Sequence, residues 1–436
     1  MKSFFLSTLS KKDKEHLSLL SIGTLLEYAD VMLYLHMAII IDKVFFSPDM
    51  KTSWFLSHMT FCSAFLFRPI GAIFLGWIGD TLGRRITIFI TTTFTAIGCL
   101  VTAVLPGYAT LGLLSAYTLT LCRMLQGITS MGEIQGAKLY MMESVKDVRT
   151  QCFCSAIFGL FSDIGTFFSI SISAFACYLM LYHKEAWRIA FLLGGAVALI
   201  GLYARKYLRE TREFTDAKMK LLKVTNNNLK ALEHPLVKIP VNRAALFFFI
   251  MSKAGDMCSL CFIPFYYCKE CLEQIGMSNI EIITQNQLVT LVVMCATLTC
   301  ALLVYAIEPL KIAIFRNWVA VIFIISAPIL LSLDTPSKYL IFGVQCCSMI
   351  FTPNESPAAP IFFKQFPIFK RSRCIFIGFS IGSAIASLLF VFPLEILKTY
   401  FGHYTLYIVP LPLIVISLIG KYYFKSLVEE PRTLSQ

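Results

Sequence analysis

The sequence predicts an all-α membrane protein whose twelve transmembrane helices form two halves of six. Composition, recurring apolar segments and one long polar loop lead to this prediction. Of the 436 residues, 57% are hydrophobic and only 15% are charged, and the mean hydropathy is +0.72, which is too apolar for a soluble protein of this length. Apolar segments that approach the roughly 20 residues needed to cross a bilayer recur throughout the chain.

The apolar segments and the loops between them define the expected order of helices. We expect helices centred near Tyr34, Leu66, Ala96, Leu121, Ser169, Val197, Cys258, Cys295, Ile322, Met349, Ala384 and Ile414. The loops are short except for a charged stretch at 208–242. The predicted division is an N-terminal tail (1–16), a first six-helix bundle (17–207), this central loop (208–242), a second six-helix bundle (243–424) and a C-terminal tail (425–436).

The basic residues predict the orientation. The formal net charge is +12, and most Lys and Arg residues fall in alternate loops, with the densest run between Arg205 and Arg243. The positive-inside rule then places both termini in the cytoplasm and assigns Arg316 and Lys421 to the inner side. We interpret the central loop as a solvated topology signal, with a contact to lipid headgroups or a regulatory contact as the alternative. No soluble domain carries a basic patch, so we expect no nucleic-acid partner.

Other chemistry is poorly represented in the chain. Cys258, Cys261, Cys268 and Cys271 read C-x2-C-x6-C-x2-C, but zinc sites favour a longer separation between the two pairs, so we expect core cysteines and no metal. No H-E-x-x-H, Walker A or G-x-S-x-G sequence occurs. We therefore expect no catalytic residues and no enzyme. The short apolar run before Lys11 lacks the features of a cleavable signal.

The stretch Arg68–Arg85, RPIGAIFLGWIGDTLGRR, places polar groups inside an apolar segment and at its end. Pro69 predicts a kink in the second helix, and the glycines permit close helix approach. We interpret the stretch as a conformational latch between helices, with an ordinary structural turn as the alternative. The residues assigned to the latch are Arg68, Gly76, Asp80, Gly83, Arg84 and Arg85.

Buried charges in the first half are candidates for substrate or proton binding, because an unpaired ion inside a membrane is unfavourable by at least several kcal/mol. Glu27 and Asp30 lie three residues apart and share a helix face, which suits a proton carrier. Arg123 lies on a polar face of the fourth helix, and Glu133 continues this face with some drift. Asp163 adds an acid in the fifth helix. Structural pairing is the alternative for each of these groups.

The second half offers fewer candidates. Lys253 and Asp256 lie three residues apart, and we expect them to neutralise one another. Pro353, Pro357 and Pro360 should break the tenth helix. Broken helices free backbone groups to line a cavity, so Asn354 and Glu355 are candidate site residues.

These motifs resemble those of the metabolite:proton symporters of the major facilitator superfamily. RPIGAIFLGWIGDTLGRR resembles their R-P-x-G followed by G-x-x-x-D-x-x-G-R-R. RMLQGITSMGEIQG is similar to R-x-x-Q-G-x-x-x-G-G-E, and LLEYAD and WRIAFLLGG resemble E-W-Y-D and W-R-I-P-F. The resemblance covers residues 1–210. The second half departs from it, because LLVYAIEPLKIAIFRN keeps only Glu308, Lys311 and Arg316 where the loop signature should repeat.

The resemblance implies two six-helix bundles related by a pseudo-two-fold axis, a cavity at the midplane and alternating access. It also implies proton-coupled uptake of a small zwitterion such as proline or betaine, or of an organic acid, across a bacterial plasma membrane. The expected partners are the solute, protons and lipid. We expect a functional monomer that needs the proton gradient and no cofactor. A transport-dead sensor or scaffold, and a proton-independent facilitator or exporter, are the alternatives.

Overall fold

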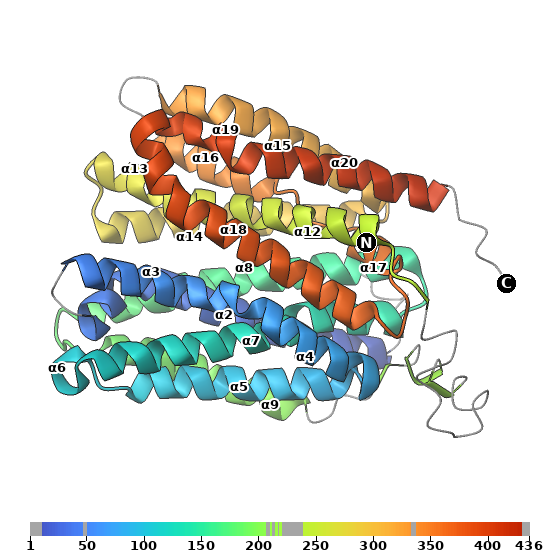
Figure 1. The fold of residues 1–436 in the computed structure, drawn as a ribbon, viewed down its shortest axis with the longest axis horizontal. Helices are drawn as coiled ribbons and strands as arrows, with labels where there is room; N and C mark the ends of the chain where they lie inside the picture. Colours follow the sequence, from blue (N-terminus) through green and yellow to red (C-terminus); the bar gives the residue numbers. More distant parts are fainter. Residues whose placement is uncertain are drawn as a thin grey trace.

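The computed structural model describes residues 11–46, 50–205, 210–211, 214–216, 218–219, 239–332 and 337–429, and these residues form helices joined by short connections. Most of the predicted central loop and the outer parts of both predicted tails lie outside the described residues. In Figure 1 the N-terminal half, blue to green, lies below the C-terminal half, yellow to red, and most helices run along the long axis.

The N-terminal half contains six crossings. The second crossing is interrupted at Phe67, because Pro69 lies in the first turn of a new helix where its missing N–H is tolerated. The helices are α2 (Lys11–Phe45), α3 (Met50–Leu66) with α4 (Arg68–Thr81), α5 (Arg84–Val104), α7 (Leu113–Ser144), α8 (Val148–Leu179) and α9 (Trp187–Arg205), with the short α6 (Tyr108–Leu111) before α7.

The C-terminal half contains the other six crossings. Its first crossing passes through a π-helical stretch, η2, and its fourth is broken into two helices. The elements are α12 (Arg243–Met257), η2 (Cys258–Tyr267) and α13 (Cys268–Gln274), then α14 (Asn279–Leu303), α15 (Pro309–Leu331), α16 (Lys338–Ile350) with α17 (Ala359–Phe363), α18 (Arg371–Phe401) and α20 (Pro410–Glu429). The 3₁₀ turn Gly402–Tyr404 and α19 (Thr405–Ile408) join α18 to α20.

Nine stretches of the described chain meet length and hydropathy criteria for a membrane span. The shorter apolar helices at 187–203 and 338–350 and the long helix α7 complete twelve crossings. Arg123 and Lys138 on α7 interrupt its apolar character. The predicted fold, an all-α protein with twelve transmembrane helices in two six-helix bundles, is confirmed.

Glycine allows the helices of the first half to pack backbone against backbone. A Cβ atom at Gly71 on α4 would lie 1.9 Å from the carbonyl oxygen of Ile128 on α7. A Cβ atom at Gly165 on α8 would lie 2.3 Å from the carbonyl oxygen of Leu25 on α2. Side chains larger than hydrogen are therefore excluded at both positions, which fixes α7 and α8 beside the helices that carry Arg68 and Glu27.

The two halves pack against each other along the length of the molecule. Phe65 of the first half meets Phe262 of the second with ring centroids 6.3 Å apart, inside an apolar cluster that draws from both halves. At the other end, α18 runs obliquely from the upper half to the lower half and packs against α4 (Figure 1). Buried polar groups between these two contact regions form the candidate site.

Candidate functional site

The candidate site is built around a stretch of non-helical backbone at 351–358, between α16 and α17. Arg316 of α15 donates hydrogen bonds to the carbonyl oxygens of Ile350 and Ser356, each at 3.0 Å. Lys421 of α20 donates to the carbonyl oxygen of Pro353 at 2.9 Å. Backbone groups without helical partners are tolerated at membrane depth only where other groups satisfy them, and these two cations do so. The predicted break of the tenth helix is present.

Four buried ionised side chains lie next to this stretch and form a chain of ion pairs, which we call the charge quartet: Lys138, Glu355, Lys253 and Asp256. Glu355 accepts from Lys138 at 3.4 Å and from Lys253 at 3.3 Å. Lys253 also contacts Asp256 at 2.5 Å, and Thr352 donates to the other oxygen of Asp256 at 2.7 Å. The predicted pairing of Lys253 with Asp256 is present, but Glu355 shares the same lysine.

The quartet spans both halves of the molecule, because Lys138 lies on α7 and the other three members lie on α12 and the broken tenth helix. Beside it is a small cavity of about 50 Å³, enough for a few waters. Residues of both halves line it, including Tyr28, Lys138, Asp163, Thr297, Arg316 and Asn354.

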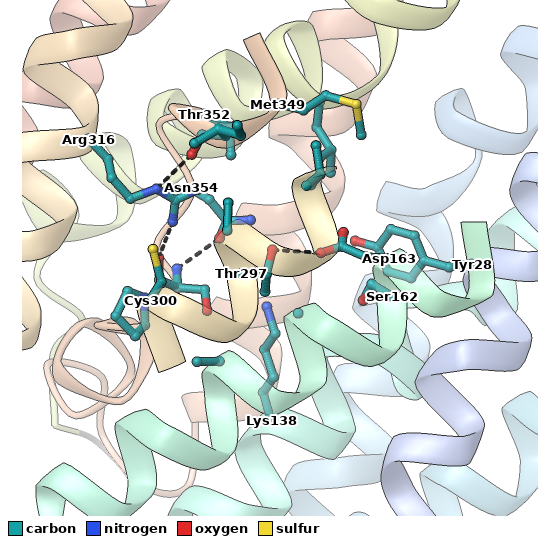
Figure 2. Close-up of a pocket in the computed structure, with 18 residues that line it drawn as sticks. Tyr28, Lys138, Ser162, Asp163, Thr297, Cys300, Arg316, Met349, Thr352 and Asn354 are labelled. Carbon is teal, nitrogen blue, oxygen red and sulfur yellow. Dashed lines mark hydrogen bonds between the residues drawn. The ribbon is translucent and has the colours of Figure 1, made fainter. Parts of the chain in front are cut away.

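Figure 2 shows how the labelled groups meet in this cavity. Lys138 extends into it from the helix below, Asp163 lies to one side with Tyr28 and Ser162, and Arg316 lies on the opposite side. Asp163 of α8 accepts a hydrogen bond from Thr297 of α14 at 2.6 Å, which joins the two halves. The cavity therefore places charges of both signs around a space between the bundles.

A second polar cluster lies inside the N-terminal half. Asp30 of α2 faces Arg123 of α7, with 3.5 Å between Oδ2 and Nη1. Its other oxygen accepts from Cys99 at 2.9 Å and from Gln126 at 3.2 Å. The Arg123 guanidinium also lies over the Tyr34 ring, 4.0 Å from the ring centroid. The structure thus pairs Asp30 with Arg123, but it does not place them on the cavity.

The first half holds two further candidates, Glu27 and Glu133. Glu27 is 3% exposed and interacts electrostatically with the buried Arg68, whose guanidinium lies 4.5 Å from the centroid of the Phe65 ring. Arg68 was assigned to the latch, but the structure brings it to Glu27 instead. Glu133 lies on α7, and its side chain is outside the part of the chain that the structure describes.

The remaining latch residues lie together at one end of the molecule. Asp80, at the end of α4, accepts hydrogen bonds from the backbone N–H groups of Ser372 and Arg373 at 3.0 and 3.1 Å. These N–H groups lie in the first turn of α18, where a carboxylate also faces the positive end of the helix dipole. Gly76 packs one turn earlier, and a Cβ atom there would lie 2.7 Å from the Cα atom of Arg373.

Arg84 ties this contact to the fourth helix. Its guanidinium donates to both oxygens of Glu143 on α7, at 3.0 and 2.8 Å, and to the carbonyl oxygen of Ile368 at 3.3 Å. Arg371 of α18 reaches the same Glu143 at 3.3 Å. Glu143 therefore holds two arginines, one from each half. Sequence reasoning did not assign Glu143 to the latch, although it continues the polar face of Arg123.

Gly83 and Arg85 take part in the contact at the start of α5 through their backbone. Gly83 has φ +120°, which favours glycine, and a Cβ atom there would lie 2.1 Å from Glu210. Glu210 accepts from the backbone N–H groups of Arg84 and Arg85 at 2.9 and 3.2 Å. The first N–H groups of α5 are thus capped by the carboxylate of Glu210, which follows α9 in the sequence.

The corresponding position in the second half has no such contact among the described residues. Glu308 and Lys311 form an exposed pair within one turn, at 3.2 Å. Arg149 donates across the halves only to a backbone oxygen, that of Tyr305, at 3.2 Å. The contact between the end of α4 and α18 therefore has no counterpart at this position among the described residues.

Three cations at the site were not predicted to lie there from the sequence. No role was assigned to Lys138 from the sequence, and Arg316 and Lys421 were assigned only to the inner side of the membrane. Lys421 is only 1% exposed and donates to Asn317 at 2.6 Å, and Arg316 is half-buried against the broken helix. The long side chains of both residues turn into the protein and reach the freed carbonyl groups. Each charge interrupts an apolar run, and that signal was available in the sequence.

A family model described as Major Facilitator Superfamily matches residues 20–354 of the chain. Over 214 residues the chain is 34% identical to a Staphylococcus aureus (strain COL) protein provisionally named as a proline/betaine transporter, with 47% of this chain and 45% of the relative covered. It is 31% identical over 202 residues to the proline/betaine transporter of Salmonella typhimurium, with 44% and 39% covered. The match spans about half the length of these relatives or less.

Solved structures resemble the whole fold. The proton:xylose symporter XylE bound to 6-bromo-6-deoxy-D-glucose aligns with a TM-score of 0.76 and 14% identity, covering 95% of this chain and 96% of XylE. The transporter FucP in its outward conformation aligns with a TM-score of 0.67 and 12% identity, covering 94% of this chain and 98% of FucP. At these identities the likeness shows the arrangement of the helices.

Proposed function

This chain belongs to the major facilitator superfamily of membrane transporters, and from this premise we propose that it carries a small zwitterion such as proline or betaine, or an organic acid, together with protons. The observation that supports a solute-carrying role most directly is the small charged cavity at the broken tenth helix, lined from both halves. A site between two bundles becomes accessible to one side of the membrane at a time when the bundles rock.

Within this proposal, Asp30, Glu27 and Asp163 carry the proton, and Arg123 sets the affinity of Asp30 for it. Asp30 lies close enough to Arg123 for a direct pair, so protonation of Asp30 would release the guanidinium. Glu355 and Asp163 contact residues across the halves and connect the cavity to the position of the bundles. The named activity of the relatives supports a zwitterionic solute.

The proton gradient supplies the energy, so no cofactor is needed in this mechanism. One proton moving down about 100 mV provides about 2.3 kcal/mol, enough for tens-fold accumulation of solute at one proton per molecule. The proposal further places a monomeric protein in the bacterial plasma membrane with both termini in the cytoplasm, as the distribution of Lys and Arg predicts.

Uptake of labelled proline, betaine and 2-oxoglutarate into proteoliposomes tests this function. We expect at least one solute to accumulate under an imposed proton gradient and to leak out when an uncoupler is added. Asp30→Asn and Arg123→Ala should reduce accumulation and flatten its dependence on pH, whereas Glu308→Gln, which alters an exposed acid with a local partner, should behave like the wild type.

Three results would contradict parts of the proposal. Uptake that only equilibrates the solute, and that the uncoupler does not change, would indicate a proton-independent facilitator or exporter. Absence of both uptake and counterflow for the whole panel would favour a sensor or scaffold. If the Asp30 and Arg123 variants kept normal uptake and pH dependence, the proton role of this pair would be wrong.

A further inference from the structure

Lys138 has an unusual position within the charge quartet. Among the described residues, Glu355 is the one carboxylate within ion-pair distance of Lys138, and the separation is 3.4 Å. Lys253, by contrast, holds Glu355 at 3.3 Å and Asp256 at 2.5 Å, and its ammonium group lies 4.3 Å from the centroid of the Phe379 ring. Glu355 would therefore keep a partner if Lys138 were taken from it.

The same ion pair joins the two bundles at the cavity. Lys138 belongs to α7 in the first half, whereas Glu355 lies in the broken helix of the second half. Lys138 lines the cavity, and its ammonium group extends into it (Figure 2). A carboxylate placed in the cavity would therefore meet the ammonium group of Lys138 directly.

The charges around the cavity leave an excess of positive charge. Two cations (Lys138 and Arg316) and one carboxylate (Asp163) line the cavity. The neighbouring buried groups add two cations (Lys253 and Lys421) and two carboxylates (Asp256 and Glu355), so the difference is one positive charge when all are ionised. Arg316 and Lys421 are held by carbonyl oxygens, which carry no full charge. One added carboxylate would balance the set, and buried charges are most stable when balanced.

We propose that the carboxylate of the transported solute replaces Glu355 at Lys138. This inference rests on the proposed transport function and names the chemistry that the cavity selects: a solute must carry a carboxylate. Binding then exchanges an ion pair between the bundles for one between the solute and the first bundle, while Glu355 stays paired with Lys253. When the solute binds, the ion pair between Lys138 and Glu355, which joins the two halves, is therefore broken.

Matched ligands and variants test this exchange in the purified full-length protein. Betaine and choline share a quaternary ammonium group but only betaine has a carboxylate, and proline and prolinamide differ in the same way. We expect betaine or proline to bind and to raise the thermal unfolding midpoint, and we expect the counterpart without a carboxylate to bind at least about 30-fold more weakly.

The variants should shift affinity in opposite directions. Lys138→Met should weaken binding of the carboxylate ligand by about 30-fold or more, and Lys138→Arg should largely retain it. Glu355→Gln removes the internal competitor and should tighten binding, while the double variant should bind as weakly as Lys138→Met. Lys311→Met, which alters an exposed lysine in a local pair, is the control and should change nothing.

The outcomes separate this inference from the proposed function. Equal binding of betaine and choline, or normal binding by Lys138→Met, would overturn the exchange and leave the transport proposal intact. Looser binding by Glu355→Gln would also overturn it, because that result makes Glu355 part of the ligand site rather than a competitor. Absence of binding by every ligand in the panel would contradict the proposed function and this inference together.

Discussion

Asp80 shows how one carboxylate can hold two halves of a membrane protein together. Each of its oxygens accepts a different backbone N–H group of α18, and Arg84 lies 3.8 Å away. These N–H groups have no partner within their own helix, so the acid supplies what the helix itself cannot. Because α4 and α18 belong to different bundles, the bonds exist only while the bundles are close at this end.

Neutralising Asp80 should therefore weaken the contact between α4 and α18. We expect Asp80→Asn to weaken the closed contact by about 1–2 kcal/mol, since charge-assisted hydrogen bonds at a helix N-terminus are lost. Hydrogen exchange at the amides of Ser372 and Arg373 should speed up accordingly, with little change in ligand affinity.

Asp147→Asn is the matched control for this experiment. Asp147 caps the start of its own helix, α8, and hydrogen bonds from Thr150 hold its pKa below the usual range, but its cap does not cross between the bundles. Exchange at α18 should be normal in this variant. A large loss of ligand affinity in Asp80→Asn without faster exchange would instead move Asp80 into the binding site.

Single residues also mark the limits of prediction from sequence. Asp80 and Arg84 were identified because their spacing in one short stretch is distinctive. The charge of Lys138 within an apolar run was visible in the sequence, but its pairing was not, because its partner Glu355 is 217 positions away. Lys421 was assigned by loop counting, although its side chain turns inward toward Pro353.

At the scale of elements, the close contact between α4 and α18 depends on the glycine at position 76. Gly76→Ala would place a Cβ atom 2.7 Å from the Cα atom of Arg373, a backbone atom that cannot move independently. The closed contact should lose about 1–3 kcal/mol by overpacking, while the interior of each bundle is unchanged. We expect solute uptake to slow by about tenfold with little change in the thermal unfolding midpoint.

Substitutions at two other glycines are the controls for this experiment. Gly71→Ala overpacks α4 against Ile128 within one bundle and should lower the unfolding midpoint itself. Gly343→Ala meets nothing within 4 Å and should leave both measurements unchanged. If Gly76→Ala behaved like Gly343→Ala, close approach of α4 and α18 would not be required for transport.

The elements differ in how far the sequence predicts them. The prolines predicted the break in the tenth helix and the interruption before α4, because proline removes a donor at a known place. The π-helical stretch Cys258–Tyr267 was not predicted, since its apolar residues also suit an ordinary helix. The four cysteines of the C-x2-C-x6-C-x2-C pattern lie in this stretch and in α13, and all four are free, buried thiols.

For the molecule as a whole, the number of crossings was predictable and the partners across the halves were not. Apolar length sets where helices occur, whereas the contact of Asp163 with Thr297 depends on how two bundles pack. The missing loop signature near Glu308 was visible in the sequence, and in the described part of the chain Glu308 pairs with Lys311 of its own turn.

Orientation is the prediction that belongs to the whole chain. Twelve crossings place both ends on the same side of the membrane, and the excess of Lys and Arg in the loops of that side predicts the cytoplasm. Protease-cleavable tags at the two ends should be cut in inside-out vesicles and protected in right-side-out vesicles. Cleavage of both tags in right-side-out vesicles would reverse the orientation and place the latch on the outer side.

The broken tenth helix also constrains how this sequence can change over evolutionary time. Arg316 and Lys421 come from two different helices, yet both donate to backbone carbonyl groups of the same eight-residue stretch, 351–358: Arg316 to Ser356 and Lys421 to Pro353. Losing either cation alone would remove the side-chain donor of a buried carbonyl group, whereas a tenth helix without the break would remove the Ser356 acceptor of Arg316 and the Pro353 acceptor of Lys421. Divergent chains should therefore keep or lose the two cations and the prolines as a set.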